Sequence, residues 1–280
     1  MCIRAVTLAD VPAICDIHRG SDGPWVDPVE CAVYVNHRLL RPFHCRVLEC
    51  RGQVVGHAEW IVNREPNRAA PSLYLGMLHV RADSQRQGVG RHLIEDGLHV
   101  ARQQGCDTLR TVPDDAAVEF YERCGFAHTA SARSYRLPVK GGRPTGWRRA
   151  RSVPARASRA LHLRLGWVQA CSSHMWEICN QPAVLATEAW SHPCLVATGA
   201  AAYVQIRYRD DSQALPVAWA NRDTPLEALL AAAQALASAR QIKSLLLAVG
   251  PEDKVQIADA EPAGEILVMA RPICQTPTDR

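Results

Sequence analysis

The chain has 280 residues, of which 48% are hydrophobic and 21% charged, with a formal net charge of +4. This length favours two domains, and the composition is that of a globular protein with enough apolar residues for two buried cores. The small net charge does not indicate a nucleic-acid-binding protein. The polar N-terminus and the interrupted apolar runs predict no signal peptide, no membrane span and a cytoplasmic location.

Cysteine and histidine spacing predicts neither a disulfide framework nor a metal site. The 11 cysteines include no C-x-x-C pair, so we expect small core residues in a reducing compartment. His92 and His99 are too far apart on one predicted helix for ligation from adjacent turns, and no metal is expected.

Helix and strand patterns alternate in the first half. Apolar residues recur at helical spacing in the expected helices, and short apolar or alternating runs mark the strands. The expected elements are a helix over residues 7–20, a hairpin over 44–62 that turns at Arg51-Gly52, a buried strand over 72–80, a helix that ends near Gly105, a short strand over 107–112, a helix over 116–124 and a closing strand over 131–139.

Residues 140–159 are rich in Gly, Pro and Arg and contain no acidic residue, which predicts a linker between two domains, 1–140 and 141–280. These arginines could touch RNA or DNA, but no binding module surrounds them, so we expect a solvated connector and no nucleic-acid partner. The second half then repeats the element order of the first: a helix over 160–179, strands over 201–209 and 214–220, a helix over 224–240 and strands over 242–249 and 264–272.

The stretch SQRQGVGRHLIEDGL, residues 84–98, places Gly88 and Gly90 between the predicted buried strand and the following helix. A helix N-terminus offers free backbone N–H groups and a partial positive charge, and glycine lets an anion approach them closely. Arg86 and Arg91 add positive charge on either side. The pattern R/Q-x-x-G-x-G/A therefore favours a phosphate-binding loop, with a plain tight turn as the alternative.

A second block, DDAAVEFYERCGF at residues 114–126, follows the next predicted strand. In this order the two blocks resemble the GNAT superfamily of N-acetyltransferases, over about residues 1–139. The resemblance implies an α/β fold of the α+β, mixed-sheet kind, in which a mostly antiparallel sheet is flanked by helices and splayed at the cofactor-binding strand. It also implies transfer of an acetyl group from acetyl-CoA, the co-substrate, to an amine.

For the cofactor, the resemblance assigns two stretches of chain. The backbone of Leu78, His79 and Val80 would bond the pantetheine arm as an added strand does, and one N–H group there would stabilise the oxyanion. The pyrophosphate would be bound by the loop residues Arg86, Gln87, Gly88, Val89, Gly90 and Arg91.

For catalysis, Tyr121 matches the family tyrosine that protonates the departing thiolate, and packing against the sheet is its alternative role. The base is less defined, because the central-strand glutamate of many relatives corresponds here to Tyr74. Glu59 on the preceding strand is the expected base, with a salt-bridged strand residue as the alternative. His57, His79 and a water chain are the remaining candidates.

The acceptor site is expected between the first helix and the first hairpin, where relatives form the substrate wall. Aromatic faces and carboxylates there would suit a cationic amine. By fold analogy the substrate residues are Trp25, Asp27, Trp60 and Tyr74, joined by Glu30 and Glu59. A surface loop is the alternative for Trp25 and Asp27. The amine, the acyl chain length and homodimer formation stay open.

The second half has the same element order without the glycine loop. Its corresponding segment, 220–230, contains no glycine, and Thr224, Pro225 and Glu227 predict a helix that caps itself and repels an anion. We therefore expect tandem GNAT-like domains, the second one degenerate. It would cover the first domain's sheet, shape the acceptor cleft or form a dimer.

Two other functions remain open from the sequence. One is an acyl-CoA-binding sensor or scaffold without turnover, which the missing strand glutamate favours. The other is acyl transfer to a hydroxyl or a carrier-bound group. We expect direct attack in a ternary complex, since neither G-x-S-x-G nor a Cys-His nucleophile pair is recognisable.

Overall fold

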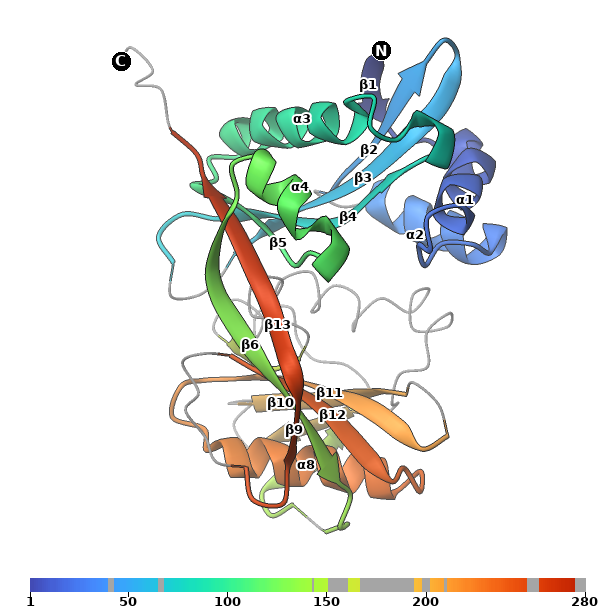
Figure 1. Cartoon of the computed structure of the whole chain (residues 1–280). Coiled ribbons are helices and arrows are strands. Elements are labelled where there is room, and N and C mark those ends of the chain that lie inside the picture. Colours follow the sequence, from blue (N-terminus) through green and yellow to red (C-terminus); the bar gives the residue numbers. More distant parts are fainter. Residues whose placement is uncertain are drawn as a thin grey trace. The chain divides into compact units, whose positions relative to one another are not determined.

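The structure, a computed structural model, describes residues 1–39, 43–64, 68–142, 144–150, 161–166, 194–197, 202–208, 211–250 and 257–274 (Figure 1). Contacts divide the chain into two compact units. Unit 1 contains Met1–Asn63, Ala69–Thr129 and Met269–Arg280, and unit 2 contains Arg64–Arg68 and Ala130–Val268. The chain therefore passes between the units several times, and residues 269–274 belong with the first half.

Unit 1 is built on a mixed sheet. Four strands pair antiparallel in chain order: β1 Cys2–Ala5, β2 Phe43–Cys50, β3 Gln53–Asn63 and β4 Ser72–Val80. The next strand, β5 Thr108–Thr111, pairs parallel with β4. The end of β13 Glu261–Pro272 pairs antiparallel with β5. β2 and β3 form the predicted hairpin, whose turn residues Arg51 and Gly52 have positive φ angles of 51° and 76°. Such a turn matches the twist of the paired strands.

Helices cover both faces of this sheet (Figure 1). α1 Val11–Arg19 and α2 Pro28–Leu39 lie on one face and α3 Val89–Gln103 and α4 Val118–Arg123 on the other, with 3-10 turns η1 Leu8–Asp10, η2 Ala82–Ser84 and η3 Asp115–Ala117 before α1, α3 and α4. The two faces are defined by β3. The Trp60 indole fills the space that a Cβ on Gly97 of α3 would need, while the His57 ring contacts His18 of α1.

β4 and β5 separate after a short pairing. They pair only from Ser72–Leu75 with Thr108–Thr111. A β-bulge places the extra residue Gly76 in β4 at the point of separation. Among the described residues, no strand fills the space between the two strands beyond this point. The predicted splay is confirmed, and it leaves the backbone edge of residues 76–80 available.

Unit 2 repeats the plan of a sheet with a long helix between two parallel strands. Its strands lie in the order β6-β12-β8-β11-β10-β9-β7, and β13, whose residues 261–268 belong to this unit, adds a strand beside β6. They are β6 Ala127–Pro138, β7 Trp147–Ala150, β8 His162–Leu165, β9 Cys194–Ala197, β10 Ala202–Tyr208, β11 Gln213–Ala220 and β12 Ser244–Val249, and the helix is α8 Leu226–Ser238. The core is aliphatic and forms where α8 covers the sheet, through side chains such as Leu229, Val204 and Leu245.

β8 lies between β11 and β12, the counterparts of β4 and β5. β11 and β12 pair in parallel only over Gln213–Ala214 with Ser244–Leu245. Beyond this pairing, β8 pairs antiparallel with the end of β11, and Leu165 of β8 pairs with Val249 of β12. Leu163 and Leu165 are almost fully buried. In unit 2 a strand of the protein therefore fills the gap that unit 1 leaves open.

Three predictions for the second half are wrong. Residues 162–165 of the predicted helix 160–179 form β8, because alternate leucines are buried in a sheet; residues 167–179 lie outside the described ranges. β7, which pairs with β9, lies inside the predicted linker. Thr224 does not cap α8, because Pro225 holds the cap position and, among the described residues, no side chain caps the first turn; the Thr224 hydroxyl instead donates to Asn221 Oδ1 at 2.5 Å. The domain boundary at residue 140 remains a prediction.

Three further findings concern cysteines, membrane spans and metals. Cys15, Cys31, Cys45, Cys106 and Cys124 are buried thiols that form no disulfide within the described residues, as expected of small core residues. Within the described ranges, no helix is long and apolar enough to cross a membrane. In the same part of the chain, no group of His, Cys, Asp and Glu side chains is arranged to hold a metal ion.

Candidate active site

The glycine loop between β4 and α3 is a tight turn with two residues of positive φ. Gly88, the residue before α3, has a φ of 85°, and Arg86 has a φ of 59°. Gly88 adopts this left-handed conformation without strain, because it has no Cβ. Gly90 is required for a different reason. A Cβ there would lie 3.1 Å from Phe120 Cζ, so glycine lets the first turn of α3 pack against α4.

The first turn of α3 leaves backbone N–H groups available. The backbone N–H group of His92 donates to Gly88 O at 3.0 Å. Among the described residues, the N–H groups of residues 88–91, which precede it, reach no backbone acceptor. The Gln85 and Gln87 side chains fold back to the carbonyls of Val80 and Asp83, at 3.1 and 2.8 Å. Free N–H groups at the positive end of a 15-residue helix suit a pyrophosphate.

Tyr121 lies where β4 and β5 separate. Its side chain is 7% exposed, packs edge-on against Phe120 and Phe126 and shares a hydrogen bond with Thr111. Thr111 ends β5 and pairs with Leu75 of β4, whose carbonyl accepts the Thr111 hydroxyl at 3.5 Å. Burial raises the pKa of Tyr121 to about 12, so the phenol keeps its proton at neutral pH. Sequence reasoning missed Thr111, for which no local pattern exists.

The candidate bases lie on the opposite face of the sheet, which α1 and α2 cover. In the register of β3 and β4, His57 pairs with His79 and Glu59 pairs with Met77, so all four side chains share this face. Glu59 is fully buried, and a Cβ on Gly76 would lie 3.8 Å from its carboxyl carbon. The expected base is therefore next to the bulge at which β4 leaves β5.

A buried chain of hydrogen bonds fixes the protons of His18 and His57. The Trp25 backbone N–H donates to His18 Nδ1 at 3.2 Å, so the proton of neutral His18 is on Nε2. That nitrogen donates to His57 Nδ1 at 3.0 Å, which places the His57 proton on Nε2, 3.1 Å from Cys45 Sγ. Burial lowers the pKa of His18 to about 3 and keeps the ring neutral. Both nitrogens of His57 are engaged, which favours a packing role.

His79 has a different hydrogen-bonding pattern. The Ser21 hydroxyl donates to Ile17 O at 2.7 Å, so its oxygen accepts from His79 Nδ1 at 3.0 Å. The imidazole lone pair is then on Nε2. His79 is only partly buried, and this burial lowers its pKa against the opposing effect of Asp114. A neutral His79 with an unprotonated Nε2 is therefore the alternative candidate to Glu59 for the general base.

Two predicted acceptor residues, Trp25 and Trp60, are buried on opposite faces of the sheet. Trp25 is buried between His18 and Tyr34, with ring centroids at 5.5 and 5.3 Å. Trp60 is buried under α3. Because neighbouring strand residues point to opposite faces, Trp60 and Glu59 cannot line one cleft. Trp60 is therefore a core residue under α3, which corrects its predicted acceptor role, whereas Trp25 lies beside His57 at 5.1 Å and its acceptor role stays a prediction.

Asp27 and Tyr74 have different surroundings. Asp27 is exposed, and its Oδ1 accepts the N–H groups of Val29 and Glu30 at 2.8 and 2.9 Å, so it caps the start of α2. Helix α2 was not among the predicted elements. Tyr74 is buried and pairs with Ile61 of β3, which places it on the same face of the sheet as Glu59.

The corresponding turn of unit 2 has the opposite polarity. Arg164 of β8 donates to the backbone carbonyls of Asn221, Arg222 and Thr224 at 3.2, 3.3 and 3.3 Å. Pro225 precedes α8 and has no N–H group. A turn whose carbonyls bind a guanidinium is unsuited to a pyrophosphate.

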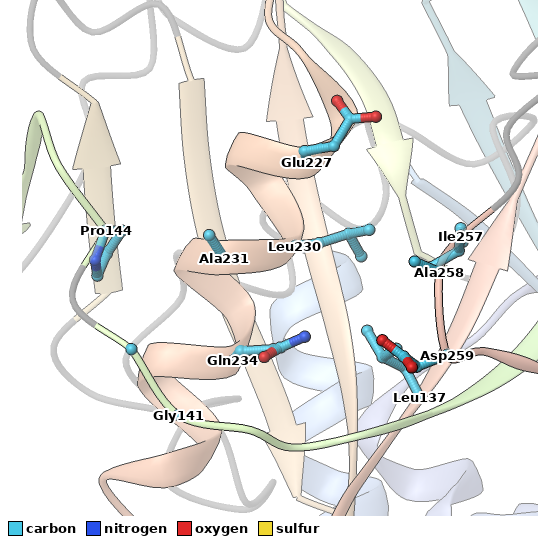
Figure 2. Close-up of a pocket in the computed structure, with 11 residues that line it drawn as sticks. Leu137, Gly141, Pro144, Glu227, Leu230, Ala231, Gln234, Ile257, Ala258 and Asp259 are labelled. Atoms are coloured by element: carbon cyan, nitrogen blue, oxygen red, sulfur yellow. The ribbon is translucent and has the colours of Figure 1, made fainter.

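A cavity of about 450 Å³ lies along α8 in unit 2 (Figure 2). Figure 2 shows Leu230 projecting from α8 toward Ile257, and most of the lining is apolar. The charged lining residues are Glu227 and Asp259, and the Asp259 carboxylate pairs with Lys140 at 2.6 Å. The charge of this cavity does not favour an anionic ligand.

Comparison with known families agrees with this geometry. Residues 12–126 match the model of the acetyltransferase (GNAT) family. This part of the chain is a GNAT-family acetyltransferase domain, and family membership implies acyl-CoA-dependent acetyl transfer. Comparison with curated protein sequences found no match.

Solved structures extend the likeness to the whole chain. A tandem GNAT protein from the clavulanic acid biosynthesis pathway, solved without AcCoA, has a TM-score of 0.62 and 17% identity, with 99% of each chain covered. GCN5-related N-acetyltransferases from Kribbella flavida and Anabaena variabilis have TM-scores of 0.67 and 0.63 and identities of 16% and 12%, with 97% of this chain and 70% and 72% of theirs covered. At these identities the likeness shows the fold, which is that of a tandem GNAT protein.

Proposed function

We propose that the protein is an N-acetyltransferase that transfers the acetyl group of acetyl-CoA to a primary amine of a small molecule or peptide. The attack would be direct, within a ternary complex. One observation carries the proposal: the Gly88 loop, the open edge of β4 and the Tyr121 hydroxyl follow one another along the line where β4 and β5 separate.

Unit 1 offers a fit for each part of the co-substrate. The free N–H groups of residues 88–91, with Arg86 and Arg91 beside them, suit the pyrophosphate. The backbone of Leu78, His79 and Val80 has no strand beside it on the β5 side among the described residues, so it can bond a pantetheine arm as an added strand. Charge developing on the carbonyl oxygen would be stabilised by an N–H group of this edge.

The chemistry then divides between the two faces of the sheet. Acetyl-CoA supplies an acetyl thioester that a neutral amine can attack. Glu59 is proposed to accept the amine proton, and Tyr121 to donate its phenolic proton to sulfur as the C–N bond forms and the C–S bond breaks. Exchange with solvent restores both groups, so the products are an amide and a free thiol. Among the predicted acceptor residues, Tyr74 shares the face of Glu59 and keeps that proposed role.

The test is release of free thiol from acetyl-CoA by the full chain in the presence of a panel of primary amines. We expect amine-dependent release by the native chain and none by Gly88→Glu, whose side chain would place a carboxylate at the anion site. Gly105→Glu is the matched control, because Gly105 also has a positive φ, 65°, at the other end of α3. Binding of acetyl-CoA without thiol release for any amine would support an acyl-CoA sensor instead.

A further inference from the structure

A second, smaller cavity in unit 1 lies beside the first turns of α3. Its volume is about 300 Å³, and it is lined by Arg91, Ile94, Glu95, Arg123, Cys124, Gly125 and Arg271. Three guanidinium groups therefore meet one carboxylate in one small cavity. Arg123 also pairs with Glu119 at 2.5 Å on the exposed surface of α4. The remaining charge is positive and comes mainly from Arg91 and Arg271.

Arg271 is held in a defined position. It lies on the end of β13, paired with Leu109 of β5, and its Nη1 donates to Cys124 O at 2.6 Å. Gly125 makes room for it, since Gly125 has a φ of 81° and a Cβ there would lie 3.3 Å from Arg271 Nε. A guanidinium has five N–H donors, and Cys124 O uses one nitrogen. The rest of the fork can bind an oxyanion without a change of side-chain position.

The cavity and the glycine loop share one residue, Arg91. Arg91 belongs to the first turn of α3, whose N–H groups form the proposed pyrophosphate site, and Ile94 and Glu95 lie one turn further along the same helix. A ligand anchored by its pyrophosphate at this turn would therefore have its adjoining phosphate within reach of the arginines. The adenosine end of coenzyme A carries such a group, a 3′-phosphate monoester with close to two negative charges at neutral pH.

We propose that this cavity binds the 3′-phosphate of coenzyme A, with Arg271 and Arg91 as its ligands, and so distinguishes coenzyme A from dephospho-coenzyme A. The inference rests on the proposed function, because it assumes that coenzyme A binds at the Gly88 loop. It assigns a cofactor-binding role to a residue of the last strand, far in sequence from the glycine loop. Arginine suits this task, since its planar fork matches the geometry of a phosphate.

The experiment is calorimetric titration of the full chain with coenzyme A and, separately, with dephospho-coenzyme A. We expect coenzyme A to bind at least about tenfold more tightly, as charge-assisted hydrogen bonds to a dianion require. In Arg271→Gln, which keeps a donor for Cys124 O, the ratio of the two affinities should fall close to one. Arg102→Gln, at the far end of α3, should leave the ratio unchanged. Glu95→Gln should increase the ratio, because it removes a like charge.

The outcomes distinguish failure of the phosphate assignment from failure of the proposed function. Equal affinities for the two ligands in the native chain would overturn the phosphate assignment and leave the proposed function intact. An Arg271→Gln variant that weakens both ligands by the same factor would show a structural role and also overturn it. Failure of both ligands to bind the native chain would overturn the proposed function and this inference with it.

Discussion

The turn from β4 to α3 in unit 1 and the turn from β11 to α8 in unit 2 occupy the same place in two similar arrangements, yet they have opposite chemistry. The first enters its helix through glycines and leaves N–H groups available. The second enters through Pro225, and its carbonyls accept hydrogen bonds from Arg164. One turn suits an anion, whereas the other already binds a cation from its own unit.

The strands beside these turns also differ, because a gap is open in unit 1 and filled in unit 2. β4 and β5 separate and leave a backbone edge uncovered, whereas β11 and β12 separate around β8. A pantetheine arm bound to β4 would take the place that β8 takes in unit 2. The same arrangement of sheet and helix therefore has an open strand edge and free N–H groups in unit 1, whereas in unit 2 a strand fills the gap and the carbonyls of the turn bind an arginine.

The largest expected effect concerns Tyr121, the proposed acid of unit 1. Tyr121→Phe should lower kcat by about 10²–10⁴-fold, because the phenolic proton is removed while the ring and its packing stay. Affinity for acetyl-CoA should not change, which calorimetry can check beside the kinetics. Tyr208→Phe in unit 2 is the control. Full turnover by Tyr121→Phe would reduce Tyr121 to a packing residue.

β8, the strand that fills the gap between β11 and β12, allows a stability test. Leu165→Ala removes a side chain that is 0% exposed, so the free energy of unfolding should fall by about 3 kcal/mol. Thermal or denaturant unfolding measures this loss. Leu8→Ala is the control, because Leu8 is 49% exposed and the change should cost little. Acetyl-CoA affinity should stay the same in both variants. A parallel loss of affinity in Leu165→Ala would contradict the assignment of the site to unit 1 alone.

The two candidate bases give a further test within unit 1. Glu59→Gln should lower kcat by about a hundredfold with unchanged acetyl-CoA affinity, since only the proton acceptor is lost. His79→Gln is the matched variant, on the neighbouring strand and the same face. A large loss of kcat in His79→Gln together with normal turnover in Glu59→Gln would transfer the base role to the Nε2 atom of His79.

The smallest effect is a pH dependence of stability that belongs to unit 1. Hydrogen bonds from Arg4, at 2.8 Å to each carboxylate oxygen, lower the pKa of Asp10 from 3.8 to about 2. A lowered pKa stabilises the fold above pH 4, and the stabilisation is lost as the pH falls toward 2. Because Arg4 is about a third exposed, we expect about 1–2 kcal/mol from this pair.

Asp10→Asn is the variant that tests this pair. Its unfolding free energy should be lower than that of the native chain at pH 7, and the two should converge at pH 2. If the difference in unfolding free energy between the native chain and Asp10→Asn were the same at pH 7 and at pH 2, the Arg4–Asp10 pair would not be the cause of that difference.

The glycine loop and the helices α1, α3 and α4 of unit 1 could be predicted from the sequence, because each depends on residues close together in the chain, whereas the splay of β4 was implied by the family resemblance and α2 was missed. Gly88 and Gly90 precede an apolar helical pattern, and residues 72–80 form one apolar run. The strand alternation also places Glu59 and Trp60 on opposite faces, so the corrected acceptor site was within reach of the same reasoning.

Features that depend on distant parts of the chain were not predictable in this way. β8 has only four residues, and its burial comes from pairing with β11 and β12 rather than from its own pattern. The hydrogen bond between Tyr121 and Thr111 forms only because α4 packs against the end of β5 in the folded protein. Arg271 reaches Cys124 O across a separation of 147 residues, which no local pattern reveals.

The most direct test of this account is the stoichiometry of acetyl-CoA binding to the full chain, measured by calorimetry beside Gly88→Glu. We expect one site per chain in the native protein and none in the variant. Two sites per chain, or one site that survives Gly88→Glu, would contradict it, because unit 2 would then bind acetyl-CoA despite β8 and Arg164.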